Sequence, residues 1–371
     1  MCNNSTVTPA AVVYANLSTL NDELFKSVEN NDISLVETLL QCVELDINIS
    51  DSNEETALIK ASVNGYTGIV KILLSHEQVD VNKEIIDRGS AIVIAARHGH
   101  QDVVELLLGQ KNVEVGEALL GAAQGNKIGH VELLLGKEQV DVNYANTNGD
   151  TALIHASQKG HYDIVKILLD NGQTDVNKGN KAGWTALLTA AKNGHHDIVK
   201  LLLDNGKTDV NKGSKYGWTA LMLAAQWGHP DIVELLLNHG EVDVNMWAKG
   251  GTMKTALMIA ANKGDTDVVQ LLLGQDQIDI NQEDIEKWTA LTFASSKGHT
   301  AIVELILAKD GVDVNKGDKN MTALGWAKNT DIAMLILNYE GIEPSTVEQG
   351  CNNGKEAEVK ELICQHLRDE L

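Results

Sequence analysis

The stretch TALLTAAKNGHHDIVKLLLDNGKTDVNKGSKYGW, residues 185–218, contains the pattern that decides the fold. Thr185 is placed to cap a helix over about residues 186–193, because its hydroxyl can accept a hydrogen bond from an early backbone N–H. Gly194 permits the positive φ that ends this helix. A second helix follows, with Asp197 in its first turn, where a negative charge suits the helix dipole.

The second helix, DIVKLLLD, has a broad apolar stripe that neighbouring helices must cover. Asn205 and Gly206 end it, and the polar stretch up to Trp218 predicts an extended turn. The opening phrase Thr-Ala-Leu recurs along the chain, and from Thr151 onward its spacings are 34, 34, 36, 34 and 33 residues. About eleven helix–turn–helix units are therefore predicted between residue 22 and the last residue.

These phrases resemble the ankyrin-repeat family over about 350 of the 371 residues. The shared features are Thr-Ala-Leu, Ala-Ala closing the first helix, Gly-His between helices, Ile-Val-x-x-Leu-Leu-Leu and Asp-Val-Asn. The resemblance implies an all-α solenoid of stacked helix–turn–helix units with short turns or β-hairpins. The family's Thr-Pro-Leu-His is replaced by Thr-Ala-Leu followed by Ile, Leu or Met, so we expect the threonine to cap without help from that histidine.

The expected organisation is an N-terminal segment at 1–21, a solenoid at 22–344 and a C-terminal capping repeat at 345–371. Only 27 residues separate the repeat openings at Ser90 and Glu117, so the turn between them lacks seven residues. This irregular junction, at 112–117, is either a tolerated irregularity or a kink or hinge.

Net charge, cysteine spacing and the lack of long apolar runs limit the kinds of partner and compartment that we expect. The formal net charge is −22, which disfavours nucleic acid and anionic membrane as partners unless the basic groups are segregated, and no DNA partner is expected. Four cysteines without a C-x-x-C pattern predict reduced thiols and no metal site, as in a cytosolic protein. No apolar run approaches the length of a membrane span. The final RDEL, 368–371, resembles an endoplasmic-reticulum retrieval signal, but without a credible leader we expect a cytoplasmic location.

The tryptophans and lysines indicate a binding surface. Three tryptophans directly precede a repeat-opening threonine, one lies in a lengthened turn, one ends a first helix, and Trp326 is expected within a first helix. The neighbouring turns are rich in lysine and contain no acid, which predicts a basic, tryptophan-bearing concave surface. Trp is enriched at interface hot spots, so partner binding is favoured over simple packing. The predicted partner-binding residues are Trp184, Trp218, Trp227, Trp247, Trp288, Trp326, Lys181, Lys192, Lys215 and Tyr216.

The function expected is that of a monomeric, non-catalytic protein–protein interaction scaffold that binds an acidic or amphipathic segment, with no cofactor. One alternative is a translocated effector of an intracellular bacterium, which would act in the host cytosol. Another is a binder of lipid or nucleic-acid phosphate, which the scarcity of arginine disfavours. The recurring Gly-His histidines are interpreted as structural, because no catalytic motif accompanies them.

A Leu eight residues before Asn also recurs in the turns after the second helices. This spacing is similar to the motif that asparaginyl hydroxylases modify in ankyrin repeats, although turn geometry alone explains the same residues. The candidate hydroxylation sites are Asn82, Asn143, Asn177, Asn211 and Asn245.

Overall fold

The chain folds into paired α-helices with very little β-structure. The computed structural model describes residues 17–41, 45–85, 88–113, 115–137, 140–251, 253–318 and 322–370. Across these ranges it contains 21 helices, and the β-structure consists of isolated antiparallel bridges at turns, such as Ala145 with Thr151. The predicted all-α helix–turn–helix architecture is thus confirmed. None of these helices combines the length and apolar character needed to cross a bilayer.

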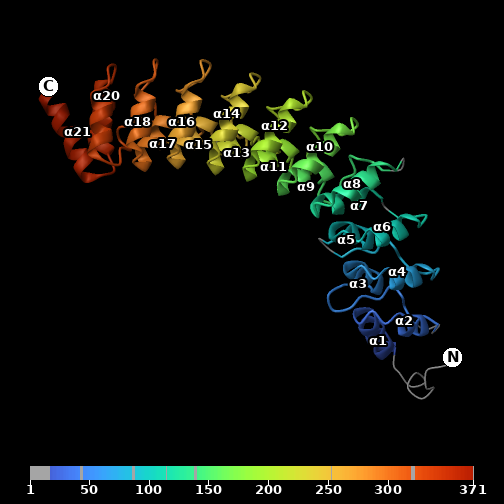
Figure 1. The fold of residues 1–371 in the computed structure, drawn as a ribbon. Helices are drawn as coiled ribbons and strands as arrows, with labels where there is room; N and C mark the ends of the chain where they lie inside the picture. Colours follow the sequence, from blue (N-terminus) through green and yellow to red (C-terminus); the bar gives the residue numbers. More distant parts are fainter. Residues whose placement is uncertain are drawn as a thin grey trace. The chain divides into compact units, whose positions relative to one another are not determined.

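The chain divides into two compact parts, an N-terminal part of residues 1–180 and a C-terminal part of residues 181–371. In the N-terminal part, first helices pack on first helices in chain order (Figure 1). These first helices are α1 (Leu17–Glu29), α3 (Ala57–Asn64), α5 (Ala91–His98), α7 (Val115–Gln124) and α9 (Ala152–Lys159). The second helices of the same repeats are α2 (Ile33–Leu39), α4 (Thr67–Leu74), α6 (Gln101–Leu108), α8 (Ile128–Leu135) and α10 (Tyr162–Asp170).

The C-terminal part repeats the plan, with one row of first helices beside one row of second helices (Figure 1). The first row contains α11 (Ala186–Asn193), α13 (Ala220–Trp227), α15 (Ala256–Lys263) and α17 (Ala290–Lys297). The second row contains α12 (His196–Asp204), α14 (Pro230–Asn238), α16 (Thr266–Leu273), α18 (Thr300–Leu307) and α19 (Thr330–Leu337). The last two helices are α20 (Pro344–Asn353) and α21 (Ala357–Glu370), which pack on each other.

Each regular first helix begins and ends as the sequence predicts. The hydroxyl of Thr185 accepts a hydrogen bond from the backbone N–H of Leu188, and Gly194 ends α11 with a φ of 75°. Five other first helices, α3, α9, α13, α15 and α17, have the same threonine cap and a left-handed glycine at the end. The alanines of these helices are almost fully buried, so adjacent first helices approach closely.

The Gly-His pair joins one repeat to the next. The Nε2–H of His229 donates to the carbonyl oxygen of Lys192, 3.2 Å away, and its ring lies against Gly194. His100 makes the same bond to the carbonyl of Val63 at 2.9 Å. A side chain at Gly194 would collide with the histidine ring, so glycine is required there both for its φ and for this contact. The structural interpretation is confirmed for His100, His161 and His229, each of which bonds to a backbone carbonyl of the preceding repeat.

At the irregular junction, α7 begins at Val115, soon after α6 ends. Glycines allow α7 to pack directly on α5, since a Cβ on Gly121 would lie 2.2 Å from the carbonyl oxygen of Val93. The ring of Tyr144 packs on Gly116 and its hydroxyl donates to Glu117 at 3.2 Å. The missing turn is thus replaced by direct helix contact and by a tyrosine from the following turn. Whether the junction is a hinge stays a prediction.

One predicted element is wrong. Trp326 was expected within a first helix, but residues 323–326 form turns. Only eight residues separate Thr322 from the start of α19 at Thr330, whereas eleven separate Thr289 from Thr300 in the preceding repeat. This distance leaves no room for an eight-residue helix and the link that follows it.

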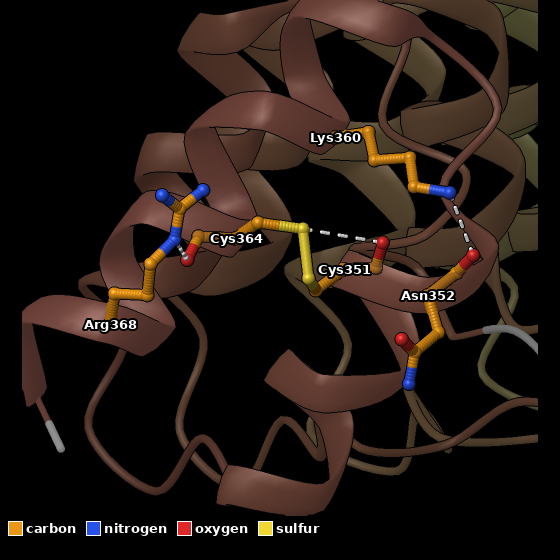
Figure 2. Close-up of a disulfide and its surroundings, with 5 residues drawn as sticks. All are labelled: Cys351, Asn352, Lys360, Cys364 and Arg368. Atoms are coloured by element: carbon orange, nitrogen blue, oxygen red, sulfur yellow. Dashed lines mark hydrogen bonds between the residues drawn. A yellow bond between two sulfur atoms is a disulfide. The ribbon is translucent and has the colours of Figure 1, made fainter.

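The prediction of reduced thiols is also wrong for two of the four cysteines. Cys351 of α20 and Cys364 of α21 form a disulfide, with their Cα atoms 4.7 Å apart (Figure 2). Nearby, the Nζ of Lys360 donates to the carbonyl of Asn352 at 2.8 Å, which further links the two helices. The pairing was not visible in the sequence because the two helices bring together residues that are 13 positions apart. Cys2 and Cys42 lie outside the described residues.

Candidate functional site

In the N-terminal part, a buried lysine on a first helix is surrounded by carboxylates. Lys60 of α3 is buried, and its Nζ lies 2.8 Å from both Glu29 Oε1 and Asp51 Oδ2. Burial alone would lower the pKa of Lys60, but hydrogen bonds and attraction from Asp51 and Glu29 outweigh it and raise the pKa. Asp51 in turn has a lowered pKa, because its bonds to Lys60 and to backbone N–H groups exceed the opposing effect of burial. These charges hold the first repeats together.

His155 of α9 occupies the position that corresponds to Lys60. It is buried, and burial lowers its pKa, which favours the neutral ring. The Gln124 amide nitrogen lies 3.1 Å from His155 Nε2 and donates to it. The equivalent position is apolar at Ile94, Leu223, Ile259 and Phe293, and carries a buried hydroxyl at Thr189.

In that C-terminal part, the turn tips form a connected row. The backbone N–H of Lys215 donates to the carbonyl of Ala182 at 2.9 Å, and that of Gly250 donates to the carbonyl of Tyr216 at 3.1 Å. These two bonds link three successive tips, each about one repeat further along the chain. Tryptophans placed on these tips have fixed backbone positions.

A polar side chain closes each of two tips and orients its tryptophan. Asp284 is buried, and its Oδ1 accepts from the backbone N–H groups of Glu286 and Trp288, both at 2.9 Å. The backbone N–H of Asp284 donates to the carbonyl of Trp288, which completes the tip. Ser214 and Trp218 form the same closed pair, with the hydroxyl as acceptor at 3.3 Å. This role is not among the sequence predictions, although a short polar residue four positions before each Trp was the available signal.

Three predicted binding residues come together beside the tip that carries Trp184. The Nζ of Lys192 lies 5.2 Å from the ring centroid of Trp184 and 5.5 Å from that of Trp227. Such cation–π contacts contribute about 0.5–1 kcal/mol each at exposed sites. One ammonium group thus lies near both indoles, and the backbone of this lysine is bonded to His229 of the next repeat.

The large apolar side chains here are unusually exposed. Tyr216 is 59 % exposed, Trp227 56 % and Trp247 42 %. All three lie on tips or at the end of a first helix, where the core does not need them. Together with Lys192 and Trp184, these three residues form a surface that we name the aromatic–lysine surface. Its members are Trp184, Lys192, Tyr216, Trp227 and Trp247.

Two further predicted tryptophans line a separate pocket. The ring of Trp288 packs on Phe293 at 5.0 Å and on Trp326 at 4.8 Å between centroids. Together with Lys254 and Ile285 these rings line a pocket of about 420 Å³, which we name the tryptophan pocket. Lys254 Nζ lies 4.4 Å from the Phe293 ring centroid, so one lysine already covers an aromatic wall.

The remaining predicted site residues are on the same tips without belonging to either cluster. Lys181 and Lys215 are exposed, and Trp218 is half-buried. Lys178, from the same lysine pattern, lies in the N-terminal part and donates to the carbonyl of Asn143 at 2.7 Å. Its ammonium group therefore bonds to a neighbouring turn.

The candidate hydroxylation residues form a ladder of hydrogen bonds. The Asn211 amide donates to the carbonyl of Glu241 at 2.7 Å, and its oxygen accepts from the N–H of Asp243 at 2.8 Å. Asn82, Asn143 and Asn245 donate in the same way, and Asn177 occupies the equivalent position. Asn281 and Asn315 make the same pair of bonds, although the sequence analysis omitted them despite the same leucine spacing. These contacts account for the asparagines structurally, and modification stays a prediction.

In the parts of the chain that the structure describes, no group of three or more His, Cys, Asp or Glu residues is arranged to hold a metal ion. No curated protein matches the chain. A family model described as "Ankyrin repeats (3 copies)" matches residues 24–118, 115–180, 172–247 and 257–348. A second model, described as "Ankyrin repeats (many copies)", matches residues 223–273.

Proposed function

Because the chain belongs to the ankyrin-repeat family, we propose that it binds a partner protein through the aromatic–lysine surface of its C-terminal part. Ankyrin repeats indicate a protein–protein interaction scaffold, and proteins built from them are typically non-catalytic. Fold alone does not select a surface or a partner, so the remainder of the proposal rests on the site itself.

The observation that carries the proposal is the exposure of Tyr216 and Trp227, each more than half open to solvent. Burying a large apolar side chain contributes about 1.5–3 kcal/mol, so rings left in water on a rigid surface represent unused binding energy. Trp and Tyr are also the residues enriched at interface hot spots. If these two rings served only to pack against neighbouring turns, we would expect them to be buried.

The partner we propose is an acidic or amphipathic protein segment. The turn at 245–255 and the helix α15 that follows it contain Lys249, Lys254 and Lys263 and no acidic residue, although the whole chain carries a net charge of −22. Complementary charge would orient such a segment, while the rings supply most of the affinity. We further propose that the chain binds as a monomer and without a cofactor.

The proposed setting needs one revision. A disulfide such as Cys351–Cys364 is typical of oxidising compartments, so the cysteine pattern no longer favours the cytoplasm. An effector acting inside a host cell stays an alternative setting for the same surface, but the disulfide does not favour it.

The test compares capture of partners by three forms of the full chain: wild type, Tyr216→Ala/Trp227→Ala and Met334→Ala. Met334 is a matched control, because it is also exposed (43 %) and lies in the same part of the chain but on the second helix α19. We expect a protein captured by wild type and by the control to bind the double variant at least about thirtyfold more weakly, since one hot-spot ring is worth about 2 kcal/mol.

Purified partner and isothermal titration calorimetry give the affinities, and thermal melting confirms that all three forms are folded. If the double variant binds every captured protein as tightly as wild type does, the aromatic–lysine surface is not the binding site. A partner that instead depends on added phospholipid or nucleic acid would also contradict the proposal.

A further inference from the structure

We propose that the tryptophan pocket holds one large apolar side chain of a partner segment, whose neighbouring carboxylates pair with Lys254 and Lys297. The inference deepens the proposed function and rests on it, because it assigns a chemical class of occupant to a second place on the same part of the chain. The evidence comes from the size of the pocket, its walls and the charges at its rim.

The size of the pocket selects a single side chain. A volume of about 420 Å³ lies toward the small end of the range for ligand sites, about 300–1,000 Å³. This space accommodates one aromatic or branched aliphatic side chain with part of its backbone.

The walls are apolar and mutually supported. Trp288 packs on both Phe293 and Trp326, and Asp284 fixes the backbone of Trp288 from below the tip. At the rim, Ile285 is 55 % exposed, which is unusual for an aliphatic residue on a tight turn. An apolar occupant would cover Ile285 and stack on the indoles, and rigid aromatic walls lose little entropy when they bind.

The charges at the rim favour a carboxylate over a cation. Lys254 and Lys297 line the pocket, and neither has a carboxylate within ion-pair distance among the described residues. A cationic occupant would meet Lys254 where it already covers the Phe293 ring. Of the two acids at the pocket, Asp284 is bonded to backbone N–H groups, whereas Glu286 is exposed and opposes an acidic segment. Removing the charge of Glu286 should therefore strengthen the binding of an acidic segment.

The polar group available for the backbone of the segment is the amide of Asn262. It lies at the pocket, at the end of α15, and makes no hydrogen bond within the described ranges. An amide with both a donor and an acceptor can pair with the main chain of an extended segment. The pocket thus combines an apolar floor, two ammonium groups and one amide.

The experiment uses three synthetic peptides of equal length and the full chain labelled with ¹⁵N at its six indoles. The first peptide is acetyl-Glu-Asp-Phe-Asp-Glu-amide, the second has Ala in place of Phe, and the third has Lys in place of the four acids. Indole N–H signals assigned by single Trp→Phe variants report binding up to millimolar concentration. We expect the first peptide to shift the signals of Trp288 and Trp326, and the other two to bind at least about tenfold more weakly.

Variants separate the pocket from a general effect of charge. Ser296→Phe places a ring in the pocket and should abolish the shifts, while Lys297→Glu should weaken binding and Glu286→Gln should strengthen it. Met334→Ala should leave binding unchanged. Equal binding of the phenylalanine and alanine peptides, preference for the lysine peptide, or no shift at millimolar concentration would each overturn the inference, provided that thermal melting shows Ser296→Phe to be folded.

The two proposals fail separately. If a captured partner depends on Tyr216 and Trp227 but no peptide enters the tryptophan pocket, the pocket inference is wrong and the proposed function stands. If the peptide binds the pocket as described but no captured protein depends on those two rings, the aromatic–lysine surface is wrong while the pocket assignment is retained.

Discussion

Single polar residues fix the backbone of two tryptophans, Trp218 and Trp288. Among the residues that the structure describes, Asp284 has no charged partner, yet its carboxylate is buried and accepts from two backbone N–H groups of the tip that carries Trp288. Ser214 serves the tip that carries Trp218 in the same way. At this scale the sequence predicted the aromatic residues and overlooked the small residues that position them, because an Asp or Ser in a turn has many other uses.

Asp284→Ala should lower the free energy of unfolding by about 1–3 kcal/mol, since two partly buried N–H groups lose their acceptor. Asp284→Asn keeps an oxygen in place and should lose less than half as much. Urea unfolding followed by tryptophan fluorescence measures both values. Equal losses for the two variants would mean that the charge of Asp284, and not its role as an acceptor, stabilises the tip.

Single helices and their neighbours show where local pattern succeeds and where it fails. Thr185 and Gly194 bound α11 at the predicted residues, because a cap and a left-handed glycine act within one turn of chain. Trp326 was placed in a helix because Thr-Ala-Leu precedes it, but the spacing to α19 was too short for that helix to form. Repeat phrases therefore predict an element only when the distance to the next element also fits.

The junction of α5 and α7 can be tested with two glycines that differ only in their surroundings. Gly121→Ala would place a methyl group 2.2 Å from the Val93 carbonyl oxygen, and backbone atoms there cannot move aside without separating the helices. We expect a loss of about 3 kcal/mol or more in the free energy of unfolding.

The control is Gly129→Ala in α8, where no atom lies within 4 Å of the added carbon. This change should be neutral or stabilise the protein by up to about 1 kcal/mol, because alanine has the higher helix propensity. Circular dichroism during urea unfolding gives both values. A Gly121→Ala protein as stable as the control would show that the close packing of α5 on α7 is not required.

At the scale of the whole molecule, charge is distributed unevenly along an acidic chain. The N-terminal part uses buried lysine–carboxylate contacts around Lys60, while the C-terminal part carries lysines beside aromatic rings. The sequence predicted the basic surface from the absence of acids in the turns. The tryptophan pocket was not predictable, because its lining comes from residues between 254 and 326 that only the packing of successive repeats brings together.

The buried contacts around Lys60 should make the stability of the N-terminal part depend on pH. The pKa of Asp51 is lowered by folding, so its contribution is present above the ordinary pKa of 3.8 and is lost as pH falls through the lower folded value. The pKa of Lys60 is raised, so its contribution is present below the ordinary value of 10.5 and is lost as pH rises through the folded value. Stability from this cluster is thus greatest between about pH 4 and pH 10.

Lys60→Met should lower the free energy of unfolding at pH 7 by about 2 kcal/mol, because partly buried carboxylates lose their cation. It should also flatten the decline in stability below about pH 4. Lys263→Met, which removes an exposed lysine, should change neither. Thermal melting from pH 3 to pH 10 provides the curves, and an acid decline as steep in Lys60→Met as in wild type would contradict the assignment.

The Cys351–Cys364 bond also affects how the chain opens locally. In repeat proteins each element contacts only its neighbours, so short segments can detach while the rest stays folded. With the bond intact, α20 and α21 cannot detach one at a time, and an opening event that exposes either must strain or release both. Reduction allows either helix to open without the other, so the redox state of the surroundings controls access by proteases to this end of the solenoid.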